Sequence, residues 1–384
     1  MKSLFLLDPS VTYLNHGSFG ACPKSIFKDY QRWQRELEAE PVQFITKNAP
    51  RYLGQSRQAL AGFVHCDPDD LFFTPNPTTA VNTIMRSLNL RPGDEILATD
   101  HEYGAMDRTW NFYQARSGVR YVRARIELPV SSREQILTQF WSGLSKNTKV
   151  IFLNHMSSAT ALIFPVREIC EKARELGLIT IIDGAHVPGH IDLDIAALDP
   201  DFYTGTAHKW LLTPKGSSFL SVSKRFQSML DPLVVSWGYQ SVHPGKSRFL
   251  DYHEHQGTRD ISAYLTLPAA LEFRKQNDWE SCIAASKQLI LDNYARFCAL
   301  LETRPICPVT DEFLGQMCSV PILTPDAAAL KELLFDRFRI EIPIMTLGEH
   351  TFIRISLNGY NRASCLDRLY DALREIKSST NLIR

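Results

Sequence analysis

Two polar segments carry the residue types of a reactive amine site. The run IIDGAH (181–186) ends one apolar stretch with Asp183, and TGTAHKW (204–210) ends the next with Lys209. A carboxylate that leaves one buried strand and an amine that leaves its neighbour can face one ligand from two sides. A lysine amine bonds to an aldehyde, and a carboxylate keeps a pyridine nitrogen protonated. The pair predicts a site for pyridoxal 5'-phosphate (PLP), although a lone Asp or His-Lys commonly serves only a turn or the surface.

Alternating strand and helix patterns place both segments on one sheet. Helix-period segments such as 132–144 and 166–177 lie between short apolar runs. The runs with strand character span residues 95–100, 119–126, 148–155, 178–185, 201–206 and 217–223. This order predicts an α/β fold with a mainly parallel sheet that is covered on both faces. The site is then expected beyond the carboxyl ends of the strands.

Chain length and a change of pattern predict two domains. The chain has 384 residues, whereas single hydrophobic cores stop growing near about 250–300 residues. After about residue 262, long helical stretches and a few short strands replace the alternation. We expect an N-terminal arm at 1–22, a large PLP-binding domain at 23–262 and a small C-terminal domain at 263–384.

The charge balance favours a small-molecule substrate. Lys plus Arg and Asp plus Glu each total 42, so no net charge attracts nucleic acid or an anionic membrane. The first residues are too polar for a signal peptide, and no apolar run approaches the roughly 18 residues of a membrane span. The eight cysteines are scattered without metal-ligand spacing, so reduced thiols and no metal site are expected. These features predict a cytoplasmic protein.

The chain resembles the class V aminotransferase family of PLP enzymes. The resemblance runs from NHGSFG (15–20) to RISLNGYN (354–361), with the segments in the family order. Within the family it is most similar to the isopenicillin N epimerase-like branch. The resemblance implies the PLP-dependent aspartate aminotransferase fold (fold type I), with a mainly parallel, seven-stranded-type sheet in the large domain and a small α/β domain after it.

The resemblance also implies roles around the cofactor ring. It assigns the Schiff-base lysine to Lys209 and the contact with the pyridine nitrogen to Asp183. His101 stands where the family has the aromatic side chain that stacks on the ring, and Tyr103 is a close rival. The phenolic oxygen has two candidate contacts, which are Ser158 and His186.

The segment NPTTAVN (76–82) resembles the family's phosphate-binding turn. Backbone N–H groups at the start of a helix bind a dianion, but Pro77 replaces the usual glycine and removes one donor. The expected phosphate ligands are Thr78, Thr79, Thr206, His208 and, from the neighbouring subunit, Thr258. The cross-subunit ligand implies a homodimer with active sites at the interface. A capping turn is the plain alternative for Thr78 and Thr79 of this segment and for Thr258.

The substrate end is expected at the C-terminal strand and the N-terminal arm. Arg354 matches the family's arginine that binds the α-carboxylate of an amino-acid substrate, for which a planar guanidinium is suited. Asn15 and His16 of the arm are expected to line the same end.

Fold and cofactor leave the reaction open. Epimerisation or racemisation requires a proton returned to the opposite face of the α-carbon, for which His101, Tyr103 or His186 are candidates, and the branch resemblance favours it. A carbon–sulfur β-lyase and an aminotransferase are the alternatives. A persulfide-forming cysteine desulfurase is disfavoured because residues 319–364 contain no reactive cysteine. A binding protein without activity is disfavoured because Lys209 is present.

Overall fold

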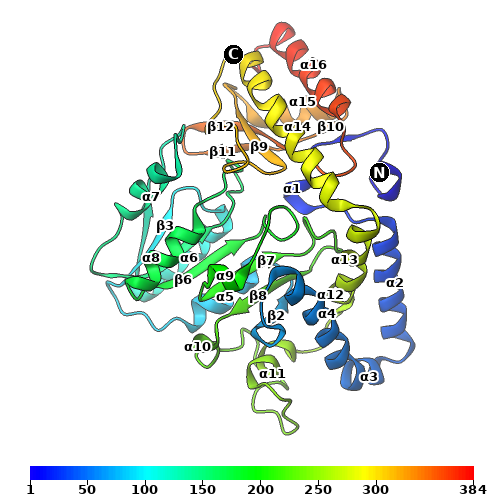
Figure 1. The fold of residues 1–384 in the computed structure, drawn as a ribbon, viewed down its shortest axis with the longest axis vertical. Coiled ribbons are helices and arrows are strands. Elements are labelled where there is room, and N and C mark those ends of the chain that lie inside the picture. Colours follow the sequence, from blue (N-terminus) through cyan, green and yellow to red (C-terminus); the bar gives the residue numbers. More distant parts are fainter.

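A seven-stranded sheet forms the centre of the computed structural model, which describes all 384 residues (Figure 1). The strand order is β2-β8-β7-β6-β5-β3-β4. The strands are β2 (Leu71–Thr74), β3 (Glu95–Thr99), β4 (Arg120–Ala124), β5 (Thr148–Asn154), β6 (Ile179–Gly184), β7 (Phe202–Thr206) and β8 (Ser218–Val222). Strands β3 to β7 pair in parallel, whereas β8 runs antiparallel to β7 and β2. The predicted mainly parallel sheet is confirmed.

Alternate side chains of the sheet belong to two separate hydrophobic cores, because successive residues of a strand point to opposite faces. Leu97 and Ile151 belong to the core beneath α4 and α8, and Ile96 and Val150 to the core beneath α5 and α6. The covering helices are α4 (Ala49–Val64), α5 (Pro77–Ser87), α6 (Gly104–Ser117), α7 (Arg133–Trp141) and α8 (Val166–Glu175). The sheet is therefore covered on both faces, as expected. Its strand ends are not covered by these helices, and the site is expected there.

A second, antiparallel sheet with the strand order β11-β12-β9 lies beyond the large one (Figure 1). Its elements are α14 (Trp279–Leu300), β9 (Met317–Pro321), α15 (Ala327–Asp336), β11 (Ile344–Leu347), β12 (His350–Ser356) and α16 (Ala363–Ser379). The short helices α12 (Ser262–Leu265) and α13 (Leu267–Gln276) pack against α2 (Lys24–Ala39) and α4 instead. The domain limits 1–22, 23–262 and 263–384 stay a prediction.

The N-terminal arm pairs with a C-terminal strand and packs against the turn after β7. Strand β1 (Thr12–Tyr13) pairs in parallel with β10 (Ile340–Glu341), and the one-turn helix α1 (His16–Phe19) follows it. Gly20 ends α1 with φ 69° and ψ 170°, a conformation that is open almost only to glycine. A Cβ atom there would overlap the carbonyl oxygen of His208. The arm therefore lies directly on the backbone that carries Lys209.

The remaining elements are short connections. They are η1 (Lys2–Leu4), α3 (Pro41–Gln43), η2 (Phe44–Asn48), η3 (Pro68–Asp70), α9 (Ile195–Leu198), α10 (Lys224–Gln227) and α11 (Arg248–Glu254). None of the helices combines the length and the apolar character that crossing a membrane requires.

Candidate active site

A cavity of about 320 Å³ opens at the carboxyl ends of β5, β6 and β7. Most of the predicted site residues line it, namely Thr78, Tyr103, Ser158, Asp183, His186, Thr206, His208, Lys209 and Arg354. The predicted residues His101, Thr79, Asn15, His16 and Thr258 do not. The location agrees with the rule that open α/β sheets bind ligands beyond the carboxyl ends of their strands.

Lys209 lies in the turn after β7, and its Nζ is 3.2 Å from Nε2 of His186. Burial lowers the pKa of Lys209 to about 7, and the Arg354 guanidinium adds to this effect, whereas the Asp183 carboxylate opposes it. Near neutral pH a substantial fraction of the amine is therefore unprotonated and nucleophilic. Burial also lowers the pKa of His186 well below its usual value, so this imidazole is neutral beside the lysine.

Asp183 is buried near the end of β6, between the β5 and β7 strand ends. One of its carboxylate oxygens accepts the backbone N–H of Ala185 at 2.9 Å, and the other has no hydrogen-bond donor in the chain. Burial raises the pKa of Asp183, while the Ala185 N–H and the Lys209 charge oppose that rise. A protonated ring nitrogen placed at the free oxygen would supply the missing partner.

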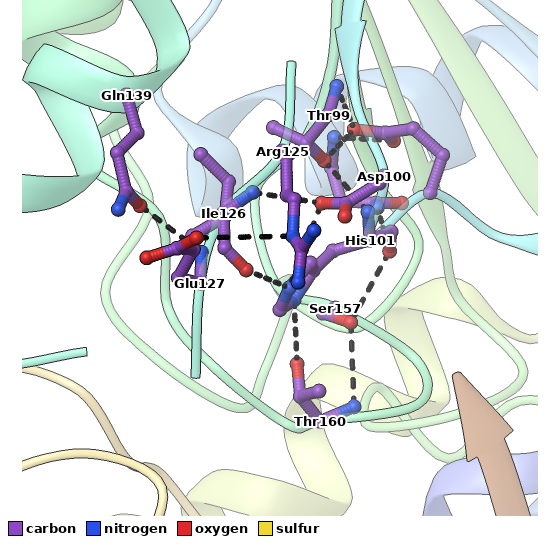
Figure 2. A network of polar contacts seen from close by, with 11 residues as sticks. Thr99, Asp100, His101, Arg125, Ile126, Glu127, Gln139, Ser157 and Thr160 are labelled. Atoms are coloured by element: carbon purple, nitrogen blue, oxygen red, sulfur yellow. Dashed lines mark hydrogen bonds and ion pairs between the residues drawn. The ribbon is translucent and has the colours of Figure 1, made fainter. Parts of the chain in front are cut away.

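His101 does not line the cavity; its side chain lies among polar groups that include Ile126 and Thr160 (Figure 2). The His101 side chain is only 1% exposed, its Nε2 lies 3.1 Å from the Ile126 carbonyl oxygen, and its Nδ1 lies 3.3 Å from Thr160 Oγ1. Burial lowers the pKa of His101, so a neutral ring donates to Ile126 and accepts from Thr160. Both nitrogens are satisfied there. Tyr103, which is 48% exposed, lies on the cavity wall instead.

The start of α5 forms the wall expected to meet the phosphate. Asn76 caps the helix, and its side-chain oxygen accepts from the Thr79 backbone N–H at 2.8 Å and from Thr79 Oγ1 at 3.1 Å. Thr79 is thereby directed to the cap and does not line the cavity, while Asn76, Pro77 and Thr78 do. Sequence reasoning missed Asn76, although an Asn just before a helix is a common capping signal.

Thr206 and His208 approach the same cavity from the other side. The Thr206 hydroxyl is buried and has no hydrogen-bond partner in the chain. His208 Nδ1 lies 2.9 Å from the Ser217 carbonyl oxygen, and burial lowers the pKa of His208 to about 4. An anion beside the free Nε2 would favour protonation of this ring, because opposite charge stabilises the imidazolium.

Arg354 is buried in β12 and is held by the N-terminal arm. One terminal nitrogen donates to the Ser158 carbonyl at 2.7 Å and to the Ser158 hydroxyl at 3.2 Å. The other donates to the Ser18 hydroxyl at 2.8 Å and to the Asn15 side-chain oxygen at 3.4 Å. Burial lowers the pKa of Arg354 to about 10, so the guanidinium stays charged at neutral pH. Nε has no partner.

Asn15 and His16 stand behind the cavity. Asn15 contacts Arg354, and His16 Nε2 lies 3.0 Å from the Lys209 carbonyl oxygen, while its Nδ1 lies 2.8 Å from the Tyr360 hydroxyl. The expectation that these two side chains line the substrate end is therefore not met, because their polar atoms are turned to the protein. The next residues of the arm, Ser18 and Phe19, line the cavity, and sequence reasoning missed them.

Thr258 lies in a separate cavity of about 270 Å³ with Trp237 and Arg259. The Trp237 side chain is 86% exposed. Within one chain, Thr258 does not reach the cavity that holds Lys209.

The aminotransferase class-V family profile matches residues 18–369. The chain belongs to the class-V aminotransferase family. It is 37% identical to isopenicillin N epimerase of Streptomyces clavuligerus, over 97% of this chain and 96% of that protein. Isopenicillin N epimerase of Amycolatopsis lactamdurans is 34% identical, over 96% of each chain. A probable chloroplastic L-cysteine desulfhydrase of Arabidopsis thaliana is 27% identical, over 95% of this chain and 83% of the other.

Solved structures share the fold of this chain. The cysteine desulfurase of Thermococcus onnurineus NA1 has a TM-score of 0.83 at 18% identity, over 98% of this chain and 96% of the other. The cysteine desulfurase CsdA of Escherichia coli has a TM-score of 0.80 at 19% identity, over 98% and 97%. The predicted fold type I architecture is confirmed.

The class-V family is a family of PLP-dependent enzymes, and this chain is one of them. Three features of the cavity fit the cofactor. Lys209 offers an amine with a lowered pKa, Asp183 offers a free carboxylate oxygen, and Thr206 offers a buried hydroxyl without a partner. The predicted cofactor is therefore confirmed, while the role of each residue toward it is a proposal.

Proposed function

We propose that this class-V enzyme is an epimerase or racemase that inverts the α-carbon of an amino acid or of an amino-acid-derived substrate. The observation that carries the proposal is the 37% and 34% identity to two isopenicillin N epimerases over nearly the full chain. Isopenicillin N is therefore the first substrate to test, beside free amino acids.

Two residues carry the chemistry in this proposal. PLP supplies an aldehyde that bonds to amines and a protonated ring that withdraws electrons from the α-carbon. Lys209 would hold the cofactor covalently and, once freed by the substrate amine, would take the α-proton, for which a pKa near 7 is suited. Asp183 would keep the ring nitrogen protonated through its free oxygen. His186, 3.2 Å from the lysine amine, and Ser158 stay the candidates for the phenolic oxygen.

The two ends of the cavity have separate tasks. Thr78, Thr206, His208 and the first N–H groups of α5 bind the phosphate, supported by the position of all three side chains on the cavity wall. Arg354 binds the substrate carboxylate with its charge and its unpartnered Nε. Asn15 orients Arg354 through the hydrogen bond at 3.4 Å.

We further propose a homodimer in the cytoplasm. Thr258 would reach the phosphate of the neighbouring subunit. Exposed apolar side chains beside it support a buried interface in solution, because a cluster of that kind is unfavourable in water. They are Val234, Val235, Trp237, Tyr239 and Val242, whose side chains are between 41% and 86% exposed. Light scattering on the purified protein tests this, and a monomer at micromolar concentration would contradict it.

A carbon–sulfur β-lyase is the second candidate. L-cysteine desulfhydrases of 25% to 27% identity support it, but less strongly than the epimerases. A persulfide mechanism is not supported, because no cysteine lines the cavity and Cys365 lies in α16. An aminotransferase stays possible on chemical grounds alone.

The experiment incubates the PLP-loaded enzyme in heavy water with isopenicillin N and with single amino acids, sulfur-containing ones included. Proton NMR then follows the α-hydrogen and the products. Deuterium at an intact α-carbon together with the opposite configuration is the expected result. A keto acid and a lost β-substituent would establish the lyase instead. The variant Lys209→Ala is the control and should show neither.

A further inference from the structure

Inversion of an α-carbon requires acid–base groups on both of its faces, unless one group can move between them. The proposed function supplies Lys209 for one face and leaves the other unassigned. The residue assigned to the second face therefore rests on that proposed function.

Most titratable groups of the cavity cannot serve that face. The His186 imidazole lies on the lysine's own side, 3.2 Å from its amine. His208 is anchored to the Ser217 carbonyl at 2.9 Å, beside the expected phosphate end. The Arg354 guanidinium stays charged at neutral pH and is committed to binding. His101 is buried outside the cavity.

The hydroxyl groups near Arg354 are also committed. Ser158 Oγ accepts from the guanidinium at 3.2 Å. Ser18 Oγ accepts from it at 2.8 Å and donates to the Asn15 side-chain oxygen at 2.5 Å. Thr78 and Thr206 belong to the expected phosphate end, and Asp183 to the ring nitrogen. This leaves the Tyr103 phenol, whose hydroxyl makes no hydrogen bond within the chain.

The sheet order puts Tyr103 and Lys209 on opposite sides of Asp183. Lys209 follows β7, Asp183 lies near the end of β6, and Tyr103 follows β3, with β5 between β6 and β3. At about 4.8 Å per strand, β7 and β3 are separated by roughly 14 Å. Two long side chains that converge from these strand ends leave room for a flat ring between them.

The Tyr103 hydroxyl also reaches the substrate end and the solvent. Tyr103 and Arg354 line the same cavity. Tyr103 is 48% exposed, so its phenol can exchange protons with water after each turnover. A residue in this position can transfer a proton to the α-carbon and then recover its own proton from water.

We propose that Tyr103 is the second acid–base residue of the inversion. In one direction the α-carbon–hydrogen bond breaks, its proton goes to Lys209 Nζ, and its electron pair stays on carbon. The Tyr103 O–H bond then breaks, its proton forms the new carbon–hydrogen bond on the opposite face, and a phenolate remains. Lys209 and Tyr103 return to their first protonation states by exchange with water. In the reverse direction the two residues exchange roles.

The test uses Tyr103→Phe, which keeps the ring and removes the hydroxyl. The holoenzyme is incubated in heavy water with each enantiomer separately. We expect the variant to keep α-deuteration of the one enantiomer whose hydrogen faces Lys209, and to lose inversion by about 100-fold or more. Deuteration of the other enantiomer should fall by the same factor. A group that only shapes the site would reduce exchange of both enantiomers equally.

Two measurements keep the outcome interpretable. Titration of the apoenzyme with PLP should give a dissociation constant within about twofold of wild type, since the lost hydroxyl has no partner. Tyr113→Phe, which removes a hydroxyl on α6 that bonds to the Leu88 carbonyl at 3.2 Å, should invert the substrate normally. Wild-type inversion by Tyr103→Phe, or equal loss of both exchanges with normal PLP binding, would overturn the proposal. A wild-type enzyme that eliminates instead of inverting would overturn the proposed function itself.

Discussion

Gly20 gives the sharpest test of how the arm supports the site. In Gly20→Ala the new Cβ overlaps the His208 carbonyl oxygen and lies 2.9 Å from the Lys209 Cα atom. Backbone atoms of the turn after β7 cannot move aside as a side-chain tip can. The substitution also forces alanine into φ 69° and ψ 170°, which costs roughly 1–3 kcal/mol by itself. Helix α1 is therefore expected to detach from the turn that carries His208 and Lys209.

The loss at the cavity wall can be estimated from two contacts of α1, those with Lys209 and Arg354. The His16 contact with the Lys209 carbonyl contributes about 1 kcal/mol, and the charged contact between Ser18 and Arg354 about 1.5–3 kcal/mol. Release of α1 thus costs the site roughly 2.5–4 kcal/mol. Hydrogen exchange by mass spectrometry should show faster exchange of residues 14–20, with protection of the central sheet unchanged.

Gly216→Ala is the matched control for this substitution. Gly216 also has a positive φ, 85°, but a Cβ atom there meets nothing within 4 Å. This variant should lose only roughly 1–2 kcal/mol of unfolding free energy, from the conformation alone, and the arm should stay protected from hydrogen exchange. Wild-type exchange of residues 14–20 in Gly20→Ala, or the same loosening in Gly216→Ala, would refute the overlap argument.

Three further predictions concern the cavity. Arg354→Lys should weaken amino-acid binding by roughly 10- to 100-fold, because an ammonium cannot replace one or two charge-assisted hydrogen bonds. The affinity for PLP should change little. Equal losses in titrations with the amino acid and with PLP would contradict the role of Arg354. Capture of PLP by the apoenzyme should accelerate as the pH rises through about 7, where Lys209 loses its proton, and a midpoint near 10 in stopped-flow absorbance would contradict the lowered pKa. The lowered pKa also means that the unfolded chain binds more protons between about pH 7 and 10.5, so the Lys209 contribution to stability rises with pH in that window. Asn76→Ala should destabilise the first turn of α5 by about 0.5–2 kcal/mol and thereby weaken PLP binding. An unchanged PLP affinity in a fluorescence titration would show that the cap does not support the phosphate site.

The parallel strands were predictable because burial on both faces leaves continuous apolar runs that end in polar residues. All six predicted strands are present within one or two residues, and Asp183 and Lys209 meet because neighbouring parallel strands end at the same edge. Strand β2 was missed because its four residues, Leu71–Thr74, are too few to show a pattern beside the preceding turn.

The orientation of single side chains was harder to predict from the sequence. His101 and Tyr103 are two residues apart in a turn, and only tertiary contacts with Ile126 and Thr160 decide which of them faces the cavity. The capping bond to Asn76 similarly draws Thr79 away from the wall. These outcomes depend on which partners are nearby in space, and the local sequence does not contain that information.

The attachment of the arm has a consequence for how the chain folds as it is synthesised. His16 meets Lys209 across 193 residues and Tyr360 across 344, and Asn15 meets Arg354 across 339. The ribosome therefore makes the arm long before its partners emerge. Contacts of such high sequence separation form late, so α1 can complete its contacts only after β12 has left the exit tunnel. The central sheet can fold earlier, but the cavity wall is complete only once Arg354 has emerged and joined it.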